Sequence, residues 1–420
     1  MSTKNQNVFE RYLNSFSGLS KEIWMLALVT LINRSGTMVI PFLTIFLTDE
    51  LDFTIGQAGA VMSAFGLGSV VGTFIGGQLT DKIGYYKVMF STLFATGVVF
   101  ILLQFFHGYW MWMAAIFVTS TIADGFRPAS MTAIAAYSKP ENRTRSVTLI
   151  RLAINTGWAI GPAIAGILAK YVGYEWLFWG DGLTCIGAAI LLTFVLSPKK
   201  TQGKENKEES DERALVDSVY ADRKFLAFVV LVSISAIAFF QLFSMIPLYF
   251  KEGLALGEDV IGYLLGFNGV LIAIIEMPIV FSFEKRFHAL RLTAIGTFLI
   301  GTTFLVLNMG SWMGFIILAI ILITIGEIFS MPFSNAFTMA RSSSSNRGSY
   351  MAVYGMAYSM AFIAAPSLGA WISSQYGWST LWYVVLGLCI LGSIGFMILN
   401  TVIQNEKRAK EASSLAQAEG

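Results

Sequence analysis

Six ionisable residues stand within long apolar stretches of this sequence. They are Arg34, Asp124, Arg127, Arg151, Glu276 and Glu327. A charge at the centre of a membrane helix costs about 2.5–3.5 kcal/mol on insertion scales, so such residues are normally paired or functional. A carboxyl group in an apolar environment also holds a proton more tightly than one in water. Glu276 and Glu327 have no base within one helical turn, and they are therefore candidates to carry protons.

The other members of this set need different explanations. Asp124 and Arg127 are three residues apart, so they can neutralise each other on one helix face. Arg34 lies roughly 15 Å into its apolar stretch and has no acid one turn away, so it needs a partner on another helix or an anionic ligand. Arg151 is close to the end of its stretch, which favours a structural role. Asp181, a few residues into another stretch, is expected near the outer interface.

A second polar pattern separates two apolar stretches. It reads Gly77-Gln-Leu-Thr-Asp81-Lys82-Ile-Gly84-Tyr-Tyr-Lys87 and lies between 56–76 and 88–106. A connection this short predicts two helices folded back as an antiparallel hairpin. The acid, the bases and the glycines are more than a turn requires, so they indicate a function.

The composition of the chain predicts the membrane-spanning helices that position these residues. The chain of 420 residues is 55% hydrophobic and 13% charged, whereas a soluble domain is about a quarter charged, so it is predicted to be an integral membrane protein. Twelve apolar runs approach or exceed the ~20 residues that span a bilayer. They are 23–48, 56–81, 88–106, 110–136, 146–170, 175–197, 225–250, 258–283, 290–308, 312–338, 348–371 and 379–403.

The runs predict an all-α membrane fold with two six-helix domains. The expected divisions are a lead at 1–22, the domains at 23–197 and 225–403, a charged linker at 198–224 and a tail at 404–420. Most Lys and Arg residues fall in the lead, the linker, the tail and alternate loops, and the opposite loops hold only Lys170 and Lys251. The positive-inside rule therefore predicts cytoplasmic termini in a multi-pass protein of the cell (inner) membrane.

The two halves are sequence repeats. Asn142-Arg143, Pro162 and Cys185 recur 204 positions later as Asn346-Arg347, Pro366 and Cys389, and Ile40-Pro41 recurs 206 positions later as Ile246-Pro247. An even number of spans per half makes the repeats parallel, and transporters built this way bind substrate between the halves near mid-membrane. Such a site could present Arg34 and Arg127 to an anionic group and Glu327 to a cationic group or a proton.

Several other classes of function lack support in the sequence. The cysteines lie in apolar runs and are expected to be buried hydrophobic side chains, and no residues have the spacing of metal ligands. No phosphate-binding loop or Ser/His/Asp set is visible, so no cofactor, nucleic acid or enzymatic activity is expected. Gly66, Gly68 and Gly72 match a loose dinucleotide fingerprint, but they lie inside an apolar run. With Gly76 they are interpreted as a helix-packing face.

The pattern Gly77-x-Leu-x-Asp81-Lys82-x-Gly84-x-x-Lys87 resembles the loop 2–3 signature of the major facilitator superfamily. The twelve runs, the repeats and the charged linker resemble the same superfamily over the whole chain. One departure is that Tyr85 and Tyr86 stand where the family often has Arg or Lys. The resemblance implies that Asp81 latches onto the start of the eleventh span, near Asn346–Gly348.

A second signature lies in the fifth span. Gly157-x-x-x-Gly161-Pro162-x-x-x-Gly166 resembles the motif of the drug:proton antiporter branch, and Arg127 matches the arginine of a fourth-span motif. The resemblance implies a monomeric secondary transporter that works by alternating access. The leading expectation is proton-coupled efflux (antiport) of small amphipathic compounds. The alternative is proton-coupled uptake (symport) of an organic anion, peptide or sugar derivative.

Overall fold

The computed structural model describes residues 18–139, 142–198, 219–283, 286–342 and 347–418. These ranges contain helices and connecting loops, and eleven segments are long and apolar enough to cross a membrane. The chain divides into two compact units, the first made of residues 1–204 and 250–273 and the second of 205–249 and 274–420. The sequence places 250–273 in the second six-helix group, whereas in the structure these residues pack with the first unit.

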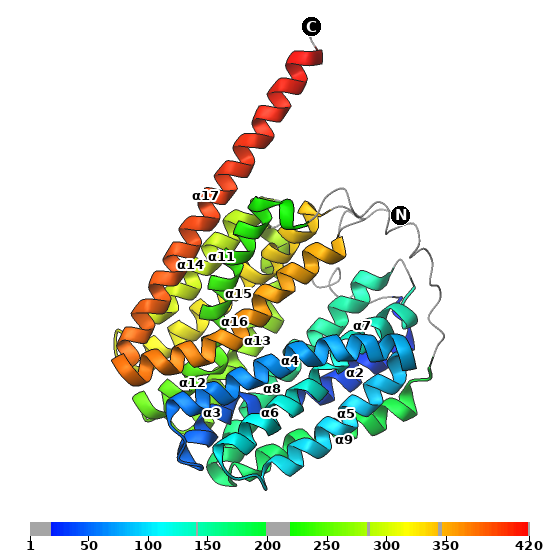
Figure 1. The fold of residues 1–420 in the computed structure, drawn as a ribbon, viewed down its shortest axis with the longest axis vertical. Coiled ribbons are helices and arrows are strands. Elements are labelled where there is room, and N and C mark those ends of the chain that lie inside the picture. Colours follow the sequence, from blue (N-terminus) through cyan, green and yellow to red (C-terminus); the bar gives the residue numbers. More distant parts are fainter. Residues whose placement is uncertain (1–17, 140–141, 199–218, 284–285, 343–346, 419–420) are drawn as a thin grey trace, which may run out of the picture. The chain divides into compact units, whose positions relative to one another are not determined.

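The first unit holds the earlier helices of the chain (Figure 1). In chain order these are α2 (Lys21–Ser35), α3 (Val39–Asp49), α4 (Ile55–Ile83), α5 (Tyr85–Leu103), α6 (Tyr109–Asp124), α7 (Phe126–Tyr137), α8 (Arg143–Tyr171) and α9 (Glu175–Val195). Helix α4 packs on α6, α5 packs on α9, and α2 packs on both α8 and α9.

Two of the predicted spans in the first unit are interrupted. The run at 110–136 forms α6 and α7, which meet at Gly125. Pro128 explains this break, because its ring excludes the carbonyl of Asp124 and it has no N–H to donate to it. The run at 23–48 forms α2 and α3, which are separated by residues 36–38. Pro41, the third residue of α3, acts in the same way on the carbonyl of Thr37, and contacts from another helix also hold this second break.

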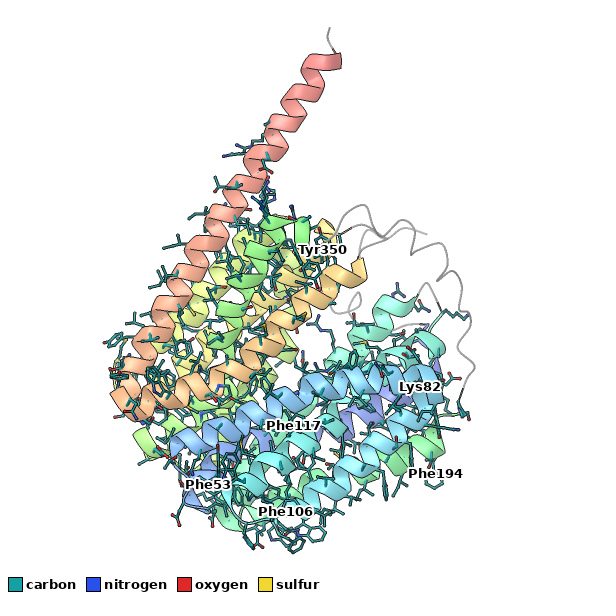
Figure 2. All side chains as sticks on the ribbon, viewed as in Figure 1. Phe53, Lys82, Phe106, Phe117, Phe194 and Tyr350 are labelled. Atoms are coloured by element: carbon teal, nitrogen blue, oxygen red, sulfur yellow. The ribbon has the colours of Figure 1, made fainter. Side chains whose placement is uncertain are left out.

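Glycines bring α4 and α6 into backbone contact. A Cβ on Gly72 would lie 2.2 Å from the carbonyl oxygen of Thr121, and one on Gly76 would lie 2.5 Å from the Cα of Gly125. A Cβ on Gly68 would lie 2.3 Å from the carbonyl oxygen of Phe117, which is labelled in Figure 2. The interpretation of these glycines as a packing face is therefore confirmed.

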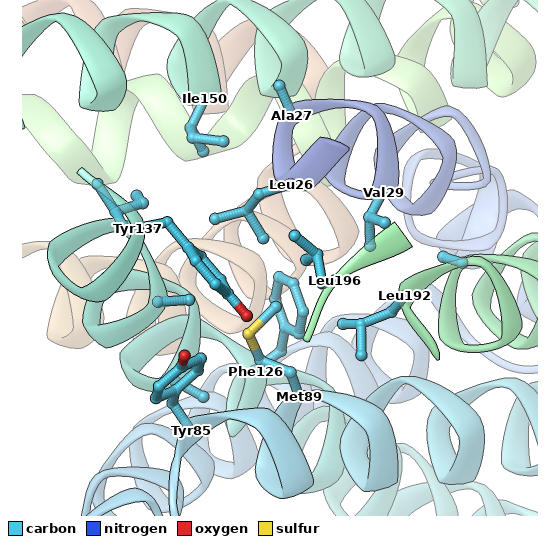
Figure 3. Close-up of a cluster of buried hydrophobic side chains, with 14 of the residues drawn as sticks. Leu26, Ala27, Val29, Tyr85, Met89, Phe126, Tyr137, Ile150, Leu192 and Leu196 are labelled. Atoms are coloured by element: carbon cyan, nitrogen blue, oxygen red, sulfur yellow. The ribbon is translucent and has the colours of Figure 1, made fainter. Parts of the chain in front are cut away.

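A buried apolar cluster joins α2, α5, α7, α8 and α9 (Figure 3). Tyr85, the first residue of α5, is 4% exposed and stacks edge to face on Tyr137, with the ring centroids 5.8 Å apart. Tyr137 donates a hydrogen bond from its hydroxyl to the carbonyl of Ser197 at 2.8 Å. Tyr85 thus anchors the hairpin in the core, which explains an aromatic residue where the family often has a base.

The second unit contains the later helices. In chain order the elements after the linker are η2 (Val219–Ala221), α11 (Arg223–Phe240), η3 (Gln241–Phe243), α12 (Met245–Leu248), η4 (Tyr249–Gly253), α13 (Glu258–Phe283), α14 (Ala289–Leu307), α15 (Met313–Arg341), α16 (Arg347–Tyr376) and α17 (Trp378–Ala418). Helix α14 packs on α15 and α17, and α11 packs on α16. Helix α17 continues through most of the predicted tail, and α13 contributes its start to the first unit.

Candidate functional site

The break between α2 and α3 is held by a carboxylate from α9. The N–H of Met38 donates to Oδ1 of Asp181 at 2.8 Å, and the N–H of Val39 donates to Oδ2 at 3.1 Å. Asp181 is 2% exposed, so its carboxylate is enclosed by the protein. The first N–H groups of a helix have no intrahelical acceptor, and a negative charge there also complements the helix dipole. Asp181 supplies both an acceptor and a negative charge to the start of α3.

The fifth-span motif packs directly against this break. A Cβ on Gly157 would lie 2.4 Å from the Cβ of Arg34, and one on Gly161 would lie 2.7 Å from the carbonyl oxygen of Thr37. Only glycine leaves room for such an approach. Pro162 lies inside α8, which continues through it without interruption.

The other end of the motif packs on α13, within the first unit. A Cβ on Gly166 would lie 2.9 Å from the Cα of Gly262, and a Cβ on Gly269 would lie 2.6 Å from the Cα of Ala159. The motif therefore joins three segments by backbone contact, namely α8, the break in the first span and the start of α13. Small residues at such spacing allow helices to approach closely in a membrane.

Arg34, Asp124 and Arg127 form the charged group of the first unit. The guanidinium of Arg127 lies 3.4 Å from the carboxylate of Asp124, so the two residues pair as expected, but they do so across the break at Gly125, from α7 and α6. Asp124 has an 11% exposed side chain and Arg127 a 62% exposed one. Arg34 occupies the last turn of α2, interacts electrostatically with both, and has a buried Nε without a hydrogen-bond partner among the described residues.

The predicted acids Glu276 and Glu327 belong to the second unit. Glu327 is half-buried on α15 and interacts electrostatically with Tyr358 of α16. Tyr358 accepts a hydrogen bond from Tyr354 at 3.3 Å, and the hydroxyl of Tyr354 lies 2.8 Å from that of Ser334. These hydroxyls form a short polar chain beside the carboxyl group. Glu276 is half-buried on α13, while Arg151 is exposed on α8.

Most of the loop 2–3 signature is helical. Gly77, Asp81 and Lys82 lie in the last turns of α4, and Gly84 alone connects α4 to α5 with a φ of 88°. Gly84 is therefore required for its left-handed backbone, a conformation that side chains with a Cβ disfavour. Asp81, Lys82 and Lys87 are exposed, and Figure 2 labels Lys82 at the end of α4. The predicted contact of Asp81 with Asn346–Gly348 involves side chains outside the described residues.

An ionic network within the first unit lies near the ends of α3, α8 and α13. Lys251 contacts Glu258 and lies 3.6 Å from a carboxylate oxygen of Asp49. Lys170 lies 2.9 Å from the carboxylate of Asp259. Burial lowers the pKa of Lys251, but its bonds to Glu258 and Asp49 outweigh burial and raise this pKa above its ordinary value. The two bases of the loops that are predicted to face outward are thus both paired with acids.

Asp222 organises one end of the second unit. Its carboxylate accepts hydrogen bonds from Arg341 Nε at 2.6 Å, Arg341 Nη2 at 2.8 Å and the hydroxyl of Tyr350 at 3.0 Å. It also caps α11 by accepting from the N–H of Phe225 at 3.1 Å. Burial opposes the charged form, but these donors outweigh it and lower the pKa of Asp222.

The structural roles of Asp181 and Asp222 do not follow from the sequence, because each residue is close to the predicted end of an apolar run, where an acid is ordinary. A usable signal for Asp181 is the Gly36-Thr37 pair inside the first run, since both residues form helices poorly and a break there needs an acceptor for backbone N–H groups. Cys185 and Cys389 are buried free thiols, as expected.

These helices and intramembrane charges define the chain as a multi-pass membrane transporter, and comparison with known proteins identifies its family. A family model described as Major Facilitator Superfamily matches residues 23–345 and 289–418. The chain belongs to the Major Facilitator Superfamily.

Named relatives and solved structures agree with this assignment. The chain is 26% identical to a Na(+), Li(+), K(+)/H(+) antiporter of Planococcus maritimus over 84% of this chain and 89% of the relative. It is also 26% identical to the quinolone resistance protein NorA of Staphylococcus aureus, over 44% of this chain and 47% of NorA. A crystal structure of a peptide transporter POT in complex with sulfate shares the fold, with a TM-score of 0.74, 14% identity and coverage of 92% and 96%.

Proposed function

We propose that this chain is a secondary active transporter that works by alternating access and exports small amphipathic compounds in exchange for protons. The observation that carries the proposal is the packing of the Gly157–Gly166 motif against the broken first span and the start of α13. This motif resembles that of drug:proton antiporters, and here its glycines occupy positions that no larger residue fits. It therefore serves as a structural part of the protein rather than a chance pattern.

The names of the relatives support exchange and export. One is named as a cation/proton antiporter and another as a quinolone resistance protein. Glu327 is the proposed proton carrier, because it is an acid inside a membrane-spanning helix and interacts electrostatically with Tyr358, whose hydroxyl is bonded to that of Tyr354. Asp124 is a weaker candidate, since it is already paired with Arg127.

One observation favours the alternative of proton-coupled uptake of an organic anion. Arg34 has a buried Nε without a described hydrogen-bond partner, and Arg127 keeps most of its side chain exposed. A planar guanidinium is well suited to bind a carboxylate or a phosphate group. Arg34 would then bind the anionic group of a substrate.

Purified protein in vesicles containing a pH-sensitive dye distinguishes the two functions. Antiport predicts that adding ethidium on one side drives protons to that same side, whereas symport predicts that a substrate and protons move together. The assay includes Na⁺, Li⁺ and K⁺, because a relative is named for their exchange, and organic acids and dipeptides to cover uptake. If none of these compounds moves protons, both functions are wrong.

Glu327→Gln tests the proton carrier. The amide keeps the size of the side chain but cannot bind a proton, so we expect ethidium-driven proton movement to fall to background while ethidium binding remains. Glu175→Gln is the matched control, because Glu175 is exposed at the start of α9. Full pH-dependent transport by Glu327→Gln would assign the proton to another residue.

A further inference from the structure

The first span has two possible backbone arrangements at its break. In a continuous helix the N–H groups of Met38 and Val39 would donate to the carbonyls four residues earlier, those of Arg34 and Ser35. In the structure both N–H groups donate to Asp181 instead. The carbonyl of Arg34 accepts from the N–H of Thr37 at 3.0 Å. The carboxylate therefore competes with the helix's own carbonyls and stabilises the broken arrangement.

Contacts from neighbouring helices also hold the break at residues 36–38. A Cβ on Gly36 would lie 1.7 Å from the hydroxyl oxygen of Thr184, which is on α9 one turn after Asp181. Gly157 and Gly161 of α8 contact the break from another helix. Asp181, Thr184 and the fifth-span motif thus fix the same backbone segment together. The side chain of Arg34 leaves α2 one turn before this segment.

The second half of the chain provides a comparison. Its seventh span is also broken, and α12 begins at Met245, the position that the repeat pairs with Val39. The residues paired with Arg34 and Asp181 are Phe240 and Val385, which carry no charge. There, Gln241 donates from Nε2 to the carbonyl of Ala365 at 3.1 Å. A break alone does not require a carboxylate, and the acid occurs in the half that carries the arginine.

We propose that Asp181 is a positioning residue for Arg34. By accepting the first N–H groups of α3, its carboxylate adds to the effect of Pro41 and holds the break in one geometry. The break in turn fixes where α2 ends and where the guanidinium of Arg34 is presented. Among the described residues the hydrogen bonds of Asp181 go only to backbone N–H groups, and its side chain is buried, so it acts on transport through Arg34 rather than by touching a substrate. The transport part of this inference rests on the proposed function.

A spin-label distance tests the break without any transport. Labels at Trp24→Cys and Glu50→Cys lie on exposed positions at opposite ends of the first span, and both native cysteines are buried. Asp181→Asn offers one oxygen in place of two, so we expect the distance distribution to shift or broaden. Thr193→Val is the control, because Thr193 is an exposed residue of α9 that bonds only its own helix at Ile190 among the described contacts. An unchanged distance in Asp181→Asn would overturn the proposal.

Transport kinetics test the link to Arg34. We expect Asp181→Asn to lower the maximal rate of ethidium-driven proton movement by about tenfold or more, the loss expected from one charge-assisted hydrogen bond. In an Arg34→Gln background, which is itself slow, the same change should add nothing, since coupled residues are not additive. Additive losses of transport rate would overturn the proposal. So would slow transport by Asp181→Asn if Arg34→Gln transports at the normal rate.

A second variant covers the possibility that Asp181→Asn does not fold. Gly36→Ala leaves the carboxylate intact but places a methyl group against Thr184. We expect Gly36→Ala to shift the label distance as Asp181→Asn does, and to add no further loss of transport in the Arg34→Gln background. A normal label distance together with a normal transport rate would overturn the proposal. If the unaltered protein moves no protons with ethidium, the proposed function fails, but the label distance still decides whether Asp181 maintains the break.

Discussion

Asp222 joins three elements through one side chain, and its contribution to stability should depend on pH. Its folded pKa is below the ordinary value of 3.8, because the donors from Arg341, Phe225 and Tyr350 outweigh burial. A lowered pKa stabilises the fold above the unfolded value, and this stabilisation is lost as the pH falls through the folded pKa. We therefore expect the contribution to be complete at pH 7 and to disappear only below pH 3.8.

Replacing Asp222 by Asn should cost about 1.5–3 kcal/mol at neutral pH, the range for hydrogen bonds to charged groups. Thermal unfolding in detergent measures the change, and the gap between Asp222→Asn and the unaltered protein should close as the pH falls below 3.8. Asp52→Asn, at an exposed loop position, should show no such gap. A pH-independent gap would mean that the carboxylate's charge is not what stabilises this end of the unit.

At the scale of helices, the packing of α4 on α6 depends on the absence of side chains. Gly72→Ala places a Cβ 2.2 Å from the carbonyl oxygen of Thr121, so we expect a loss of about 1–3 kcal/mol from overpacking. Gly187→Ala on α9 meets nothing within 4 Å and should instead stabilise by up to about 1 kcal/mol through helix propensity. Unfolding midpoints of the two variants, measured side by side, decide whether contact or propensity dominates.

Apolar runs locate helices well, but they do not reveal breaks that depend on other helices. The run at 56–81 became α4 because most of its residues are apolar and Thr54 with Gln57 caps its start. Pro128 makes the break in the fourth span foreseeable from local sequence. Pro41 and the Gly36-Thr37 pair make the break in the first span foreseeable in the same way, but its contact with Asp181 joins residues far apart in the sequence, and no local pattern reports that contact. The pairing of Asp124 with Arg127 was predictable because both residues lie one turn apart.

At the scale of the whole chain, the loop 2–3 signature is predicted to act in the transport cycle rather than in folding. Asp81 is exposed at the end of α4, so Asp81→Asn removes a charge without disturbing the core. We expect slower transport with unchanged ethidium binding, and Asp52→Asn serves as the control for loss of an exposed acid. Lost binding in Asp81→Asn would argue against a latch.

The distribution of Lys and Arg makes a prediction about orientation. Cysteine introduced at Lys87 should face the cytoplasm, and cysteine at Asp52 should face outward. Both positions are exposed, whereas the native cysteines are buried. In intact cells an impermeant maleimide should therefore modify Asp52→Cys and spare Lys87→Cys. The reverse pattern would invert the predicted topology.

The uncharged break before Met245 makes the second half an internal standard for the first. One molecule contains two interrupted spans of the same repeat, one held by a carboxylate and the other by an amide and close packing. Any change in lipid, detergent or temperature acts on both equally. A difference in behaviour between the two breaks within a single sample therefore reports how their surroundings differ, the Asp181 carboxylate among them, with no need to compare separate preparations.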